Sequence, residues 1–380
     1  MAHSLFLTHW FPTQENPVNG IFIREHALAI ALYHKVTVIH IQGIDRVNPK
    51  ISREEYGPLT IFRVRYPKPI FPRTGWIYML STIHRAFGEI SRDLGKPDIL
   101  HAHVYSSAPA AYFLRQTQNV PAILTEQSSA YPRNLITKNQ AILNRFLLNR
   151  LDYLMPVSEA LAVHMRRYGV HAPYRVVRNT IDTTIFHPGD SQESIRNGGI
   201  KLLTVAGLHP IKGHKYLIQA ISRTPGRDRI TLSVVGDGPE RSALEQLTLD
   251  LNLQDTIHFL GPRNKLEIAN LMRQAQLFVL TSLWDSLPAV LLEALASGLP
   301  VLASSVGGIP EIVKPFCGRL VLPGDAGNIS YGLANMIDHL PEFPSTRIAE
   351  YAESEFSYKV VGRKQSEIYE TVIQAYKQKT

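Results

Sequence analysis

The sequence predicts an α/β fold made of two Rossmann-like, doubly wound domains, each with a parallel sheet. Short runs rich in Val, Ile and Leu alternate along the chain with amphipathic segments of helical periodicity. Most of these runs are almost continuously apolar, which is typical of parallel strands covered by helices on both faces. The 380 residues suffice for two ordinary domains, and one polar stretch divides them.

The apolar runs locate the strands. In the first half we expect strands in SLFLTHW, KVTVIHI, LTIFRVR, DILHAH, AILTEQ, YLMPVS and YRVVRN. In the second half we expect them in KLLTVAG, ITLSVVGDG, IHFLG, LFVLTS, PVLAS and RLVLP. Between the first two runs lies a helical segment whose apolar face carries Phe22, His26, Ala29, Ile30 and Tyr33. Strand–helix alternation of this kind builds doubly wound sheets.

A polar, aperiodic stretch marks the boundary between the domains. The segment 187–199, HPGDSQESIRNGG, is interpreted as a linker between domains at 1–186 and 200–356. The last segment, 357–380, has a helical pattern and follows the final strand of the second domain. We expect the two domains to face each other across a cleft at the carboxyl ends of their strands, where open α/β sheets bind ligands.

Composition limits the environment of the chain. Apolar residues make up 44% and charged residues 19%, as in globular proteins. No run of about 18 apolar residues is free of charge, so we expect no membrane-spanning helix. The N-terminal MAHSLFLTHWFP lacks a basic flank and a cleavage site and is interpreted as a buried strand, not a signal peptide. The single Cys317 cannot pair within the chain, which favours a reducing, cytoplasmic location.

The net charge of +8 lies in the first half. Residues 1–190 hold 21 Lys and Arg against 13 Asp and Glu, whereas 191–380 hold 19 of each kind. This asymmetry predicts an anionic partner, such as a lipid surface or a phosphorylated acceptor, although a solvated basic face explains it equally well. The basic residues are scattered and match no reader motif, so nucleic acid is not expected.

Several familiar motifs are incomplete. Gly236 and Gly238 begin a dinucleotide fingerprint, but Arg241 stands where the third glycine belongs. There is no P-loop and no Asp-x-Asp pair of the type that holds a metal on a sugar diphosphate. His101 and His103 lie on one side of a predicted strand without a third ligand nearby, so zinc is not expected.

An acidic pair stands out in the second half. The strand LFVLTS leads to Asp285, after which Ser286 suits a helix cap and Pro288 the first helical turn. We expect the helix to end before Gly298. Glu293 lies inside this otherwise apolar helix, where a carboxylate requires a polar partner such as a sugar hydroxyl. On spacing alone, a solvated face for Glu293 and a capping role for Asp285 remain open.

Three other segments place polar groups at strand ends. In GLHPIKGHKYLIQA, Lys212 stands between a strand and a helix and can meet a phosphate beside the helix amides. In NPVNGIFIREHA, Gly20 precedes the first helix, where a glycine lets a backbone amide approach a ligand. In DILHAH, His103 ends a strand and can hydrogen-bond a sugar or phosphate. An exposed lysine, a helix-start turn and a structural histidine are the alternatives.

Taken in order, these segments resemble family 4 of the glycosyltransferases, of the group 1 type, which are retaining enzymes with the GT-B fold. The family signature is two glutamates eight positions apart before a Gly-x-Pro turn. Here the segment reads DSLPAVLLE, followed by ALASGLPVLASSVGGIPEIV. VVGDGP, HFLGP, MPVSEAL and VVRNTIDTTIF also match. The resemblance covers nearly the whole chain and implies that the C-terminal helix crosses back to the first domain.

By position, the resemblance assigns roles to the charged residues. It implies that Glu293 binds the ribose hydroxyls, that Asp285 contacts the donor sugar and that Lys212 stabilises the leaving diphosphate. Two departures matter. Asp285 is one methylene shorter than the family's glutamate, and Gly207 stands where the family usually has an Arg that shares the diphosphate charge. Candidate replacements for this Arg are Arg24, Lys215 and Arg263.

The resemblance also assigns roles to uncharged groups. It implies that Gly20 lies beneath the diphosphate and that His103 lines the sugar and acceptor side. It further implies that the backbone amides of Gly307, Gly308 and Ile309 approach the donor sugar and its phosphates.

The implied activity is transfer of a hexose-type sugar from a nucleoside-diphosphate sugar to an acceptor hydroxyl, with retention and without a metal or other cofactor. Lys212 and helix N-termini would meet the charge that grows on the leaving group. The basic first half suggests a lipid-linked or phosphorylated saccharide acceptor at the inner membrane face, as in polysaccharide or glycolipid assembly. The alternatives are a nucleotide-sugar epimerase or hydrolase of the same fold and a catalytically degenerate nucleotide-sugar-binding protein.

Overall fold

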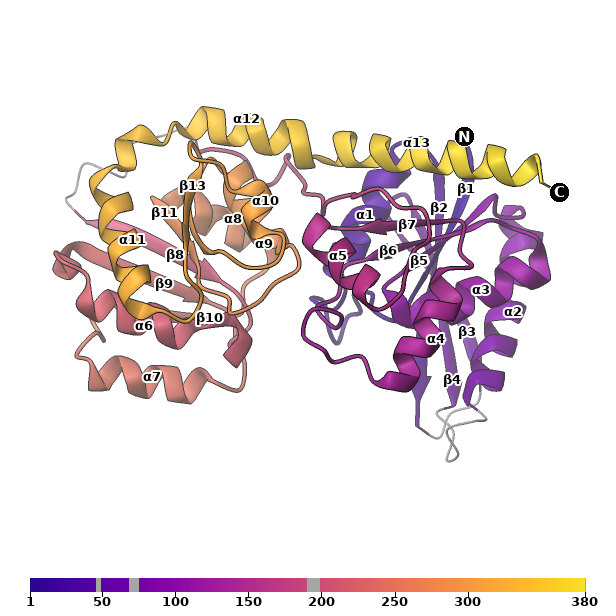
Figure 1. The fold of residues 1–380 in the computed structure, drawn as a ribbon, viewed down its shortest axis with the longest axis horizontal. Coiled ribbons are helices and arrows are strands. Elements are labelled where there is room, and N and C mark those ends of the chain that lie inside the picture. Colours follow the sequence, from indigo (N-terminus) through magenta and orange to yellow (C-terminus); the bar gives the residue numbers. More distant parts are fainter. Residues whose placement is uncertain (46–48, 68–74, 190–198, 380) are drawn as a thin grey trace. The chain divides into compact units, whose positions relative to one another are not determined.

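The computed structural model describes residues 1–380 except 46–48, 68–74, 190–198 and 380. The chain forms two compact units. Unit 1 comprises Met1–Thr180 together with Tyr358–Thr380, and unit 2 comprises Ile181–Ser357 (Figure 1). Each unit contains one sheet with helices packed on it, so the predicted α/β fold is confirmed. Most of the expected linker, 187–199, lies outside the described residues.

The sheet of unit 1 has the strand order β3-β4-β2-β1-β5-β6-β7. All neighbouring strands are parallel except β3 and β4. The chain builds outward from β1 through β2 and then returns to place β5 on the other side of β1, so the topological switch point lies between β1 and β5. The strands are β1 (His3–Thr8), β2 (Lys35–Ile44), β3 (Lys50–Tyr56), β4 (Leu59–Pro67), β5 (Ile99–His103), β6 (Ala122–Glu126) and β7 (Tyr153–Pro156).

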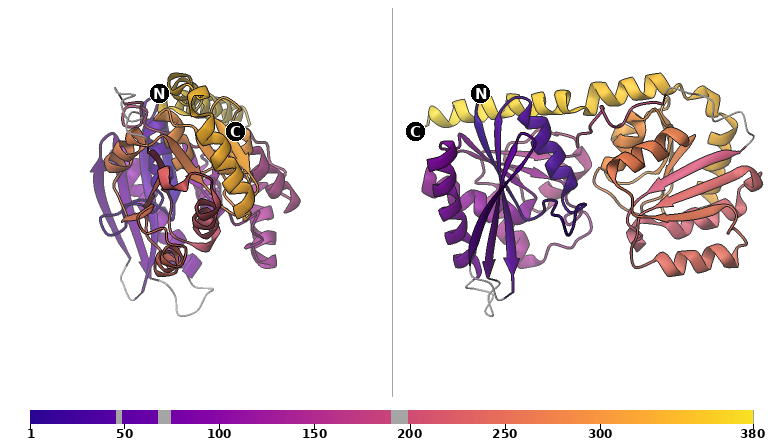
Figure 2. Two further views of the ribbon diagram at one scale, coloured as in Figure 1. Left: turned by 90° about the vertical axis from the view of Figure 1, so that its left-hand side faces the viewer. Right: turned by 180° about the vertical axis from the view of Figure 1, so that it is seen from behind.

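The helices of unit 1 cover this sheet, with α2 packed against β4 and α3 against β5. Helix α13 is the last helix of the chain and lies beside α1 (Figures 1 and 2). The helices are α1 (Ile21–Ala31), α2 (Gly75–Leu94), α3 (Ala108–Gln118), α4 (Lys138–Leu148), α5 (Glu159–Arg167) and α13 (Tyr358–Lys377), with a 3-10 turn η1 (Tyr105–Ser107) after β5.

The sheet of unit 2 has the order β10-β9-β8-β11-β12-β13 and is parallel throughout. Its switch point lies between β8 and β11. The strands are β8 (Ile200–Val205), β9 (Ile230–Val235), β10 (Ile257–Gly261), β11 (Leu277–Leu280), β12 (Val301–Ser304) and β13 (Gly318–Val321). The helices are α6 (His214–Arg223), α7 (Arg241–Asp250), α8 (Lys265–Gln274), α9 (Ala289–Ala296), α10 (Ile309–Ile312), α11 (Ala326–Asp338) and α12 (Ser345–Phe356), with 3-10 turns η3 (Pro210–Lys212), η4 (Arg227–Arg229) and η5 (Leu340–Glu342).

The strands differ from the predicted set in two places: one strand was missed and one predicted strand is absent. The polar segment KISREEY forms β3, which pairs antiparallel with β4 at the edge of the sheet. Because its side chains are mostly exposed and many are charged, it contains no apolar run that would predict a strand. Conversely, the predicted strand YRVVRN makes only one bridge, between Tyr174 and Leu154, and does not extend into a ladder.

Buried polar pairs and one close contact fix α13 on unit 1. Gly362 lies where α13 meets α1, since a Cβ at this position would stand 2.3 Å from the carbonyl oxygen of Ala29. The buried pairs are His26 Nδ1 with Gln365 Nε2 at 2.7 Å, His34 Nε2 with Ser366 Oγ at 2.8 Å, and His101 Nδ1 with Tyr369 Oη at 2.6 Å. The C-terminal helix therefore belongs to unit 1, and specific polar contacts set its register.

The buried histidines make the stability of unit 1 dependent on pH. Burial lowers the pKa of His26 to about 4 and also lowers the pKa of His34 and His101. Between pH 6.5 and 4 His26 is protonated in the unfolded chain but not in the folded one, and the lowered pKa values of His34 and His101 act in the same direction, so the free energy of unfolding falls as the pH falls. For His26 alone the loss across this range is about 3 kcal/mol.

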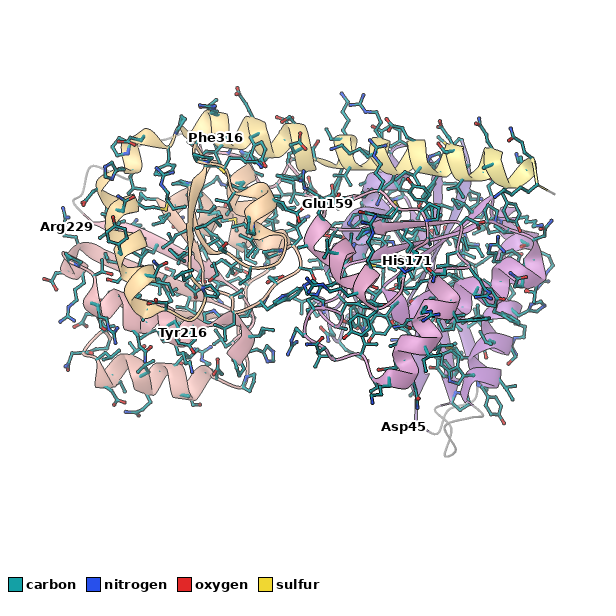
Figure 3. The ribbon with its side chains drawn as sticks, in the orientation of Figure 1. Asp45, Glu159, His171, Tyr216, Arg229 and Phe316 are labelled. Atoms are coloured by element: carbon teal, nitrogen blue, oxygen red, sulfur yellow. The ribbon has the colours of Figure 1, made fainter. Side chains whose placement is uncertain are left out.

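We expect denaturant titrations followed by far-UV circular dichroism to show this loss between pH 7 and 4.5. The variant His26→Gln should reduce the slope of the free energy of unfolding against pH. The control His171→Gln, at an exposed histidine labelled in Figure 3, should leave the slope unchanged. Equal slopes for wild type and His26→Gln would contradict the role of His26.

Candidate active site

The loops that follow β8 and β11 meet at the carboxyl edge of the sheet in unit 2. The amide of Leu283 donates to the carbonyl oxygen of Ile211 at 2.7 Å, and the Thr281 hydroxyl donates to the carbonyl oxygen of Gly213 at 3.3 Å. Because β8 and β11 flank the switch point, these loops border the crevice in which such sheets bind ligands.

An ion pair joins two of the predicted site residues across these loops. Nζ of Lys212, at the end of η3, lies 2.5 Å from the carboxylate of Asp285, although the two residues are 73 positions apart in the chain. The side chains are 26% and 14% exposed, so solvent reaches the pair. An ammonium group has three donors, and Lys212 can therefore bind an anionic ligand while keeping its contact with Asp285.

The loop after β12 packs directly on the segment that carries Asp285. Gly307 has a φ of 51°, and a Cβ there would stand 1.7 Å from the carbonyl oxygen of Asp285. The amide of Gly308 donates to the carbonyl oxygen of Ser286 at 2.8 Å. A side chain at 307 would push the Asp285 loop away, so the ion pair depends on this glycine.

Those contacts limit which amides can meet a ligand. The amide of Gly308 is used by Ser286, and the amide of Ile309 donates to the carbonyl oxygen of Val306 at 3.1 Å. The amide of Gly307 makes no backbone hydrogen bond within the described part of the chain. Of the three amides expected to approach the donor, only that of Gly307 is not already committed to a backbone partner.

Buried polar atoms gather around this edge. The hydroxyls of Ser282 and Ser304 and Nδ1 of His214 have no hydrogen-bond partner among the described residues. Burial, and then the nearby charge of Lys212, lowers the pKa of His214 to about 4, so its ring is neutral near pH 7. Since buried polar atoms usually have partners, these groups point to water or a polar ligand at this edge.

Helix α9 starts later than the sequence suggested. Pro288 is its N-cap residue, so the predicted capping role of Ser286 is wrong. Proline fixes the backbone for helix entry at that point and leaves Asp285 three residues ahead of the cap. Glu293 is half-buried, whereas its neighbours Leu292 and Ala294 are fully buried. Its carboxylate therefore belongs neither to the closed core nor to a fully solvated face.

Gly20 occupies the start of α1 in unit 1. It has a φ of 70°, and a Cβ there would stand 2.4 Å from the carbonyl group of Trp10. This contact requires a glycine whether or not a ligand is present, and the structure thus supports the helix-start explanation directly. A position of Gly20 beneath the donor diphosphate remains a hypothesis.

His103 ends β5 beside the switch point of unit 1, but it has no exposed surface. Its ring stacks on Phe6, with the ring centroids 4.7 Å apart, and lies 4.3 Å from the ring of His101. Neither ring nitrogen has a hydrogen-bond partner among the described residues. Burial, and then His101 and His26, lowers its pKa well below the usual value, so the ring is neutral. In this structure His103 has no surface with which to touch a sugar.

His209 is a residue that sequence reasoning missed. A Cβ built on Gly207 would stand 3.1 Å from Cδ2 of His209, so the imidazole fills the space that a side chain at 207 would enter. The only signal in the sequence is a titratable residue two positions after the unexpected glycine.

The three cations that could replace the family's arginine each have a partner close by in the structure. Nζ of Lys215 lies 4.8 Å from the ring centroid of Tyr216, a residue labelled in Figure 3. Arg263 pairs with Glu267 at 3.9 Å. Arg24 belongs to unit 1, where it pairs with Glu25 at 3.5 Å.

No group of three or more His, Cys, Asp or Glu side chains is arranged to hold a metal ion in the described ranges. No helix in the part of the chain that the structure covers is long and apolar enough to cross a membrane.

Comparison with protein families identifies both halves of the chain. Residues 21–185 match the model described as Glycosyltransferase Family 4, and residues 189–354 match the model described as Glycosyl transferases group 1. The chain belongs to the family 4, group 1 glycosyltransferases. The family recognised from the sequence is therefore confirmed.

The curated relatives align with this chain over part of their own length. The D-inositol 3-phosphate glycosyltransferase of Mycolicibacterium smegmatis is 26% identical over 294 residues, which cover 71% of this chain and 66% of that protein. The MMP alpha-(1->4)-mannosyltransferase of Mycolicibacterium hassiacum is 30% identical over 207 residues, which cover 52% of this chain and 48% of that protein. The aligned region thus spans less than two thirds of each relative.

Solved structures share the fold over the whole chain. The sucrose-phosphate synthase of Thermosynechococcus elongatus has a TM-score of 0.80 at 21% identity and covers 98% of this chain and 99% of that one. Anabaena HepE in complex with UDP and glucose has a TM-score of 0.76 at 17% identity and covers 98% of this chain and 100% of that one. These glycosyltransferase structures confirm the predicted GT-B fold class.

The contact between Gly307 and Asp285 yields a prediction about stability. Gly307→Ala should destabilise the protein by about 2 kcal/mol or more, because the new Cβ collides with backbone and the residue needs a positive φ. Gly88 in α2, where a Cβ would meet nothing within 4 Å, is the control, and Gly88→Ala should cost far less. Thermal unfolding of both variants tests this. Equal melting temperatures for the two variants would contradict the account of this loop.

Proposed function

We propose that this chain transfers a hexose from a nucleoside-diphosphate sugar to an acceptor hydroxyl with retention of configuration. One observation carries the proposal. Lys212 and Asp285 come from loops on either side of the switch point in unit 2 and meet in a half-buried ion pair. A cation held at such a crevice, beside the N-terminus of α6, suits a diphosphate.

In this proposal Lys212 stabilises the negative charge that grows on the leaving diphosphate as the glycosidic bond breaks. Asp285 orients the ammonium group and accepts a hydrogen bond from the donor sugar. Glu293 binds the ribose hydroxyls, and the Gly307 amide donates to a phosphate. Lys212 and the amide dipoles perform the electrostatic work that a metal performs in other transferases. Gly20 would lie under the diphosphate.

His103 has a different role in the proposal. Because it is fully buried, it acts as a positioning residue: its neutral ring packs against Phe6 and supports the end of β5. It does not touch the sugar. His209, which fills the space beside Gly207, is the residue we assign to share the diphosphate charge in place of the usual arginine.

Proteins of the same fold support the choice of donor. The Anabaena HepE structures, at 17–18% identity, contain UDP, UDP with glucose, or UDP-glucose. The relatives reported above are named as a D-inositol 3-phosphate glycosyltransferase and an MMP alpha-(1->4)-mannosyltransferase. We infer a nucleotide-sugar donor for this chain on the basis of these relatives together with the Lys212–Asp285 site.

The charge of unit 1 supports a role at a membrane. Residues 56–88 and 127–151 contain nine Lys and Arg and no Asp or Glu. Basic segments that reach the protein surface are attracted to anionic lipids. We propose peripheral contact with the inner face of the cytoplasmic membrane and a lipid-linked or phosphorylated saccharide acceptor, in polysaccharide or glycolipid assembly.

The donor site is tested by a screen. Purified protein is incubated with UDP-, GDP- and ADP-sugars and a membrane extract, and the released nucleoside diphosphate is measured. Lys212→Ala should lower kcat by about 100-fold or more, as expected for loss of a group aimed at the leaving charge. Lys215→Ala, which removes a neighbouring lysine over Tyr216, is the matched control and should keep kcat.

The outcomes of this screen separate the alternatives. Turnover that requires no acceptor would favour an epimerase or hydrolase. Nucleotide binding without turnover on any donor would favour a degenerate binding protein. If Lys212→Ala lowers the melting temperature strongly but keeps normal activity per folded molecule, the role assigned to Lys212 is wrong.

Membrane contact is tested by flotation. We expect the protein to float with vesicles of 30% anionic phosphatidylglycerol in 50 mM salt and to dissociate as the salt concentration rises. The double variant Arg133→Gln, Lys138→Gln should float less, because two cations in the acid-free segment are lost. Flotation that is equal with neutral vesicles, or no association at low salt, would contradict an electrostatic membrane contact.

A further inference from the structure

Unit 1 contains a groove of about 510 Å³ that none of the residues assigned to the donor lines. Its walls come from the loop 11–17 after β1, from α1 and from strands β2, β3 and β4. The volume lies within the range of about 300–1,000 Å³ that small-molecule sites occupy. We call it the β3 groove, because the edge strand β3 contributes to its wall.

The register of the strands brings polar side chains together in this groove. Arg63 of β4 is level with His40 of β2 and paired with Ser52 of β3, and Arg65 is level with Gln42. Side chains that are in register point to the same face of a sheet. The outer strands of unit 1 therefore carry a polar row on one face, and the groove lies along this row.

The groove is separate from a second, mainly apolar cavity at the carboxyl edge of the same sheet. That cavity is lined by Tyr66 at the end of β4, Tyr105 after β5 and residues of α2, α3 and α4. Arg65 lines the groove and Tyr66 the cavity, since consecutive residues of a strand point to opposite faces. The groove also extends to Tyr56, which pairs with Leu59 at the start of β4. It therefore runs along the face of the sheet and is distinct from the crevice at the switch point.

A buried arginine fixes the shape of the groove. The guanidinium of Arg63 donates to the carbonyl oxygen of Pro12 at 2.7 Å and to Nδ1 of His40 at 2.5 Å. It also pairs with Glu54, and its central carbon lies 5.6 Å from the ring centroid of Phe11. Burial, and then the charge of Arg63, lowers the pKa of His40 to about 3, so its neutral ring can accept this bond. Arg63 thus holds the loop 11–17 against the sheet, and the groove is preformed.

Arg24 on α1 lines the groove with donors that the protein does not use. Of its guanidinium nitrogens, only Nη2 has a partner among the described residues, Glu25 at 3.5 Å. Glu25 also accepts a hydrogen bond from Tyr358. The central carbon of the guanidinium lies 5.1 Å from the ring centroid of Tyr56. Because largely buried polar groups usually have partners, Arg24 points to a ligand with acceptor oxygens.

The lining offers hydrogen-bond donors and acceptors beside an aromatic ring. Arg24 and Arg65 supply N–H donors, Glu15 supplies a carboxylate and Gln42 an amide. Tyr56 adds a ring that is 46% exposed. A hydroxyl group both donates and accepts, so a molecule with several neighbouring hydroxyls can use both kinds of partner. The C–H face of a sugar ring complements the electron-rich face of an aromatic ring. These groups together suit a saccharide.

The charges of the groove distinguish a neutral saccharide from an anion. The lining contains three arginines and three glutamates, so it carries no net charge. Arg63 and Glu54 neutralise each other directly, and Glu55 accepts from Arg53 and Thr60. A phosphate or carboxylate is favoured by an excess of cations, whereas a neutral molecule with many hydroxyls does not require one.

We propose that the β3 groove binds a neutral saccharide. Tyr56 packs against the face of a sugar ring, Arg24 donates to its hydroxyls and Glu15 accepts from them. The site is additional to the proposed donor site in unit 2, and it retains a saccharide on unit 1 whether or not a nucleotide is bound. The inference therefore goes beyond the proposed transfer reaction and does not rest on it.

Binding of three neutral trisaccharides to the full chain tests the proposal. Maltotriose, cellotriose and mannotriose are titrated by calorimetry, with inorganic phosphate as the anionic comparison. At least one trisaccharide should bind at least 10-fold more tightly than phosphate. Tyr56→Ala should weaken this binding at least 10-fold, because it removes the ring against which the sugar packs. Tyr78→Ala on α2, at a tyrosine that is 47% exposed, is the matched control and should bind like wild type.

A second variant fills the groove while keeping the contacts of Arg24 and Arg63. Ser52→Trp places a large side chain on the polar face of β3, in a strand, where aromatic residues are well tolerated. It should also weaken trisaccharide binding at least 10-fold, and thermal unfolding of each variant shows that it is folded. The proposal is overturned if no trisaccharide binds, if phosphate binds at least as tightly as all three, or if folded Tyr56→Ala and Ser52→Trp proteins bind like wild type.

This proposal and the proposed function fail in distinguishable ways. Nucleoside-diphosphate binding is measured by calorimetry in the same Tyr56→Ala protein and should equal that of wild type. If a trisaccharide binds in the groove and no nucleotide from the UDP, GDP and ADP series binds, the transferase function is wrong and the groove stands. If nucleotide binds and is released from a donor while no trisaccharide binds, the groove proposal is wrong and the donor site stands.

Discussion

The ion pair between Lys212 and Asp285 depends on backbone contacts more than on its own charge. A partly exposed pair contributes about 1 kcal/mol or less to stability, so the pair cannot by itself hold two loops together. The loops are held by the contact of Gly307 with the Asp285 backbone and by the bond from the Leu283 amide to Ile211. Rigid backbone thus presents two weakly stabilising charges in one place, which is the arrangement that electrostatic catalysis requires.

Both sheets have the same kind of topological switch point, but the side chains at their carboxyl edges differ in chemical character. Both sheets reverse their strand order beside the first strand, so both have a topological switch point at the carboxyl edge, where such sheets bind ligands. In unit 2 that edge carries an ion pair and glycines that let backbones approach each other. In unit 1 it carries neutral histidines and an apolar cavity. In the proposed function this difference suits a charged donor bound at the edge of unit 2.

Apolar runs predicted most of the fold because parallel strands covered on both faces must be apolar, whatever the tertiary context. β3 was missed because an edge strand needs no such run. The site was predicted only at the level of residue type. The family resemblance singled out Lys212 and Asp285, for which spacing alone left structural roles open, but the loss of the Gly308 and Ile309 amides to local bonds, the burial of His103 and the position of His209 depend on contacts between distant segments.

Two departures from the family pattern, the short side chain of Asp285 and the glycine at position 207, both affect the surroundings of Lys212. A glutamate at 285 carries its carboxylate one methylene further, whereas the aspartate reaches Lys212 at 2.5 Å from a backbone already fixed by Gly307. With Gly207 the loop loses a guanidinium, and the imidazole of His209 takes the vacated space. Both substitutions leave one lysine, oriented by one aspartate, as the principal cation of the crevice. In the proposed mechanism the site is therefore poorer in fixed charge than the family pattern that the sequence resembles, and the proposed chemistry depends on how firmly Lys212 is positioned.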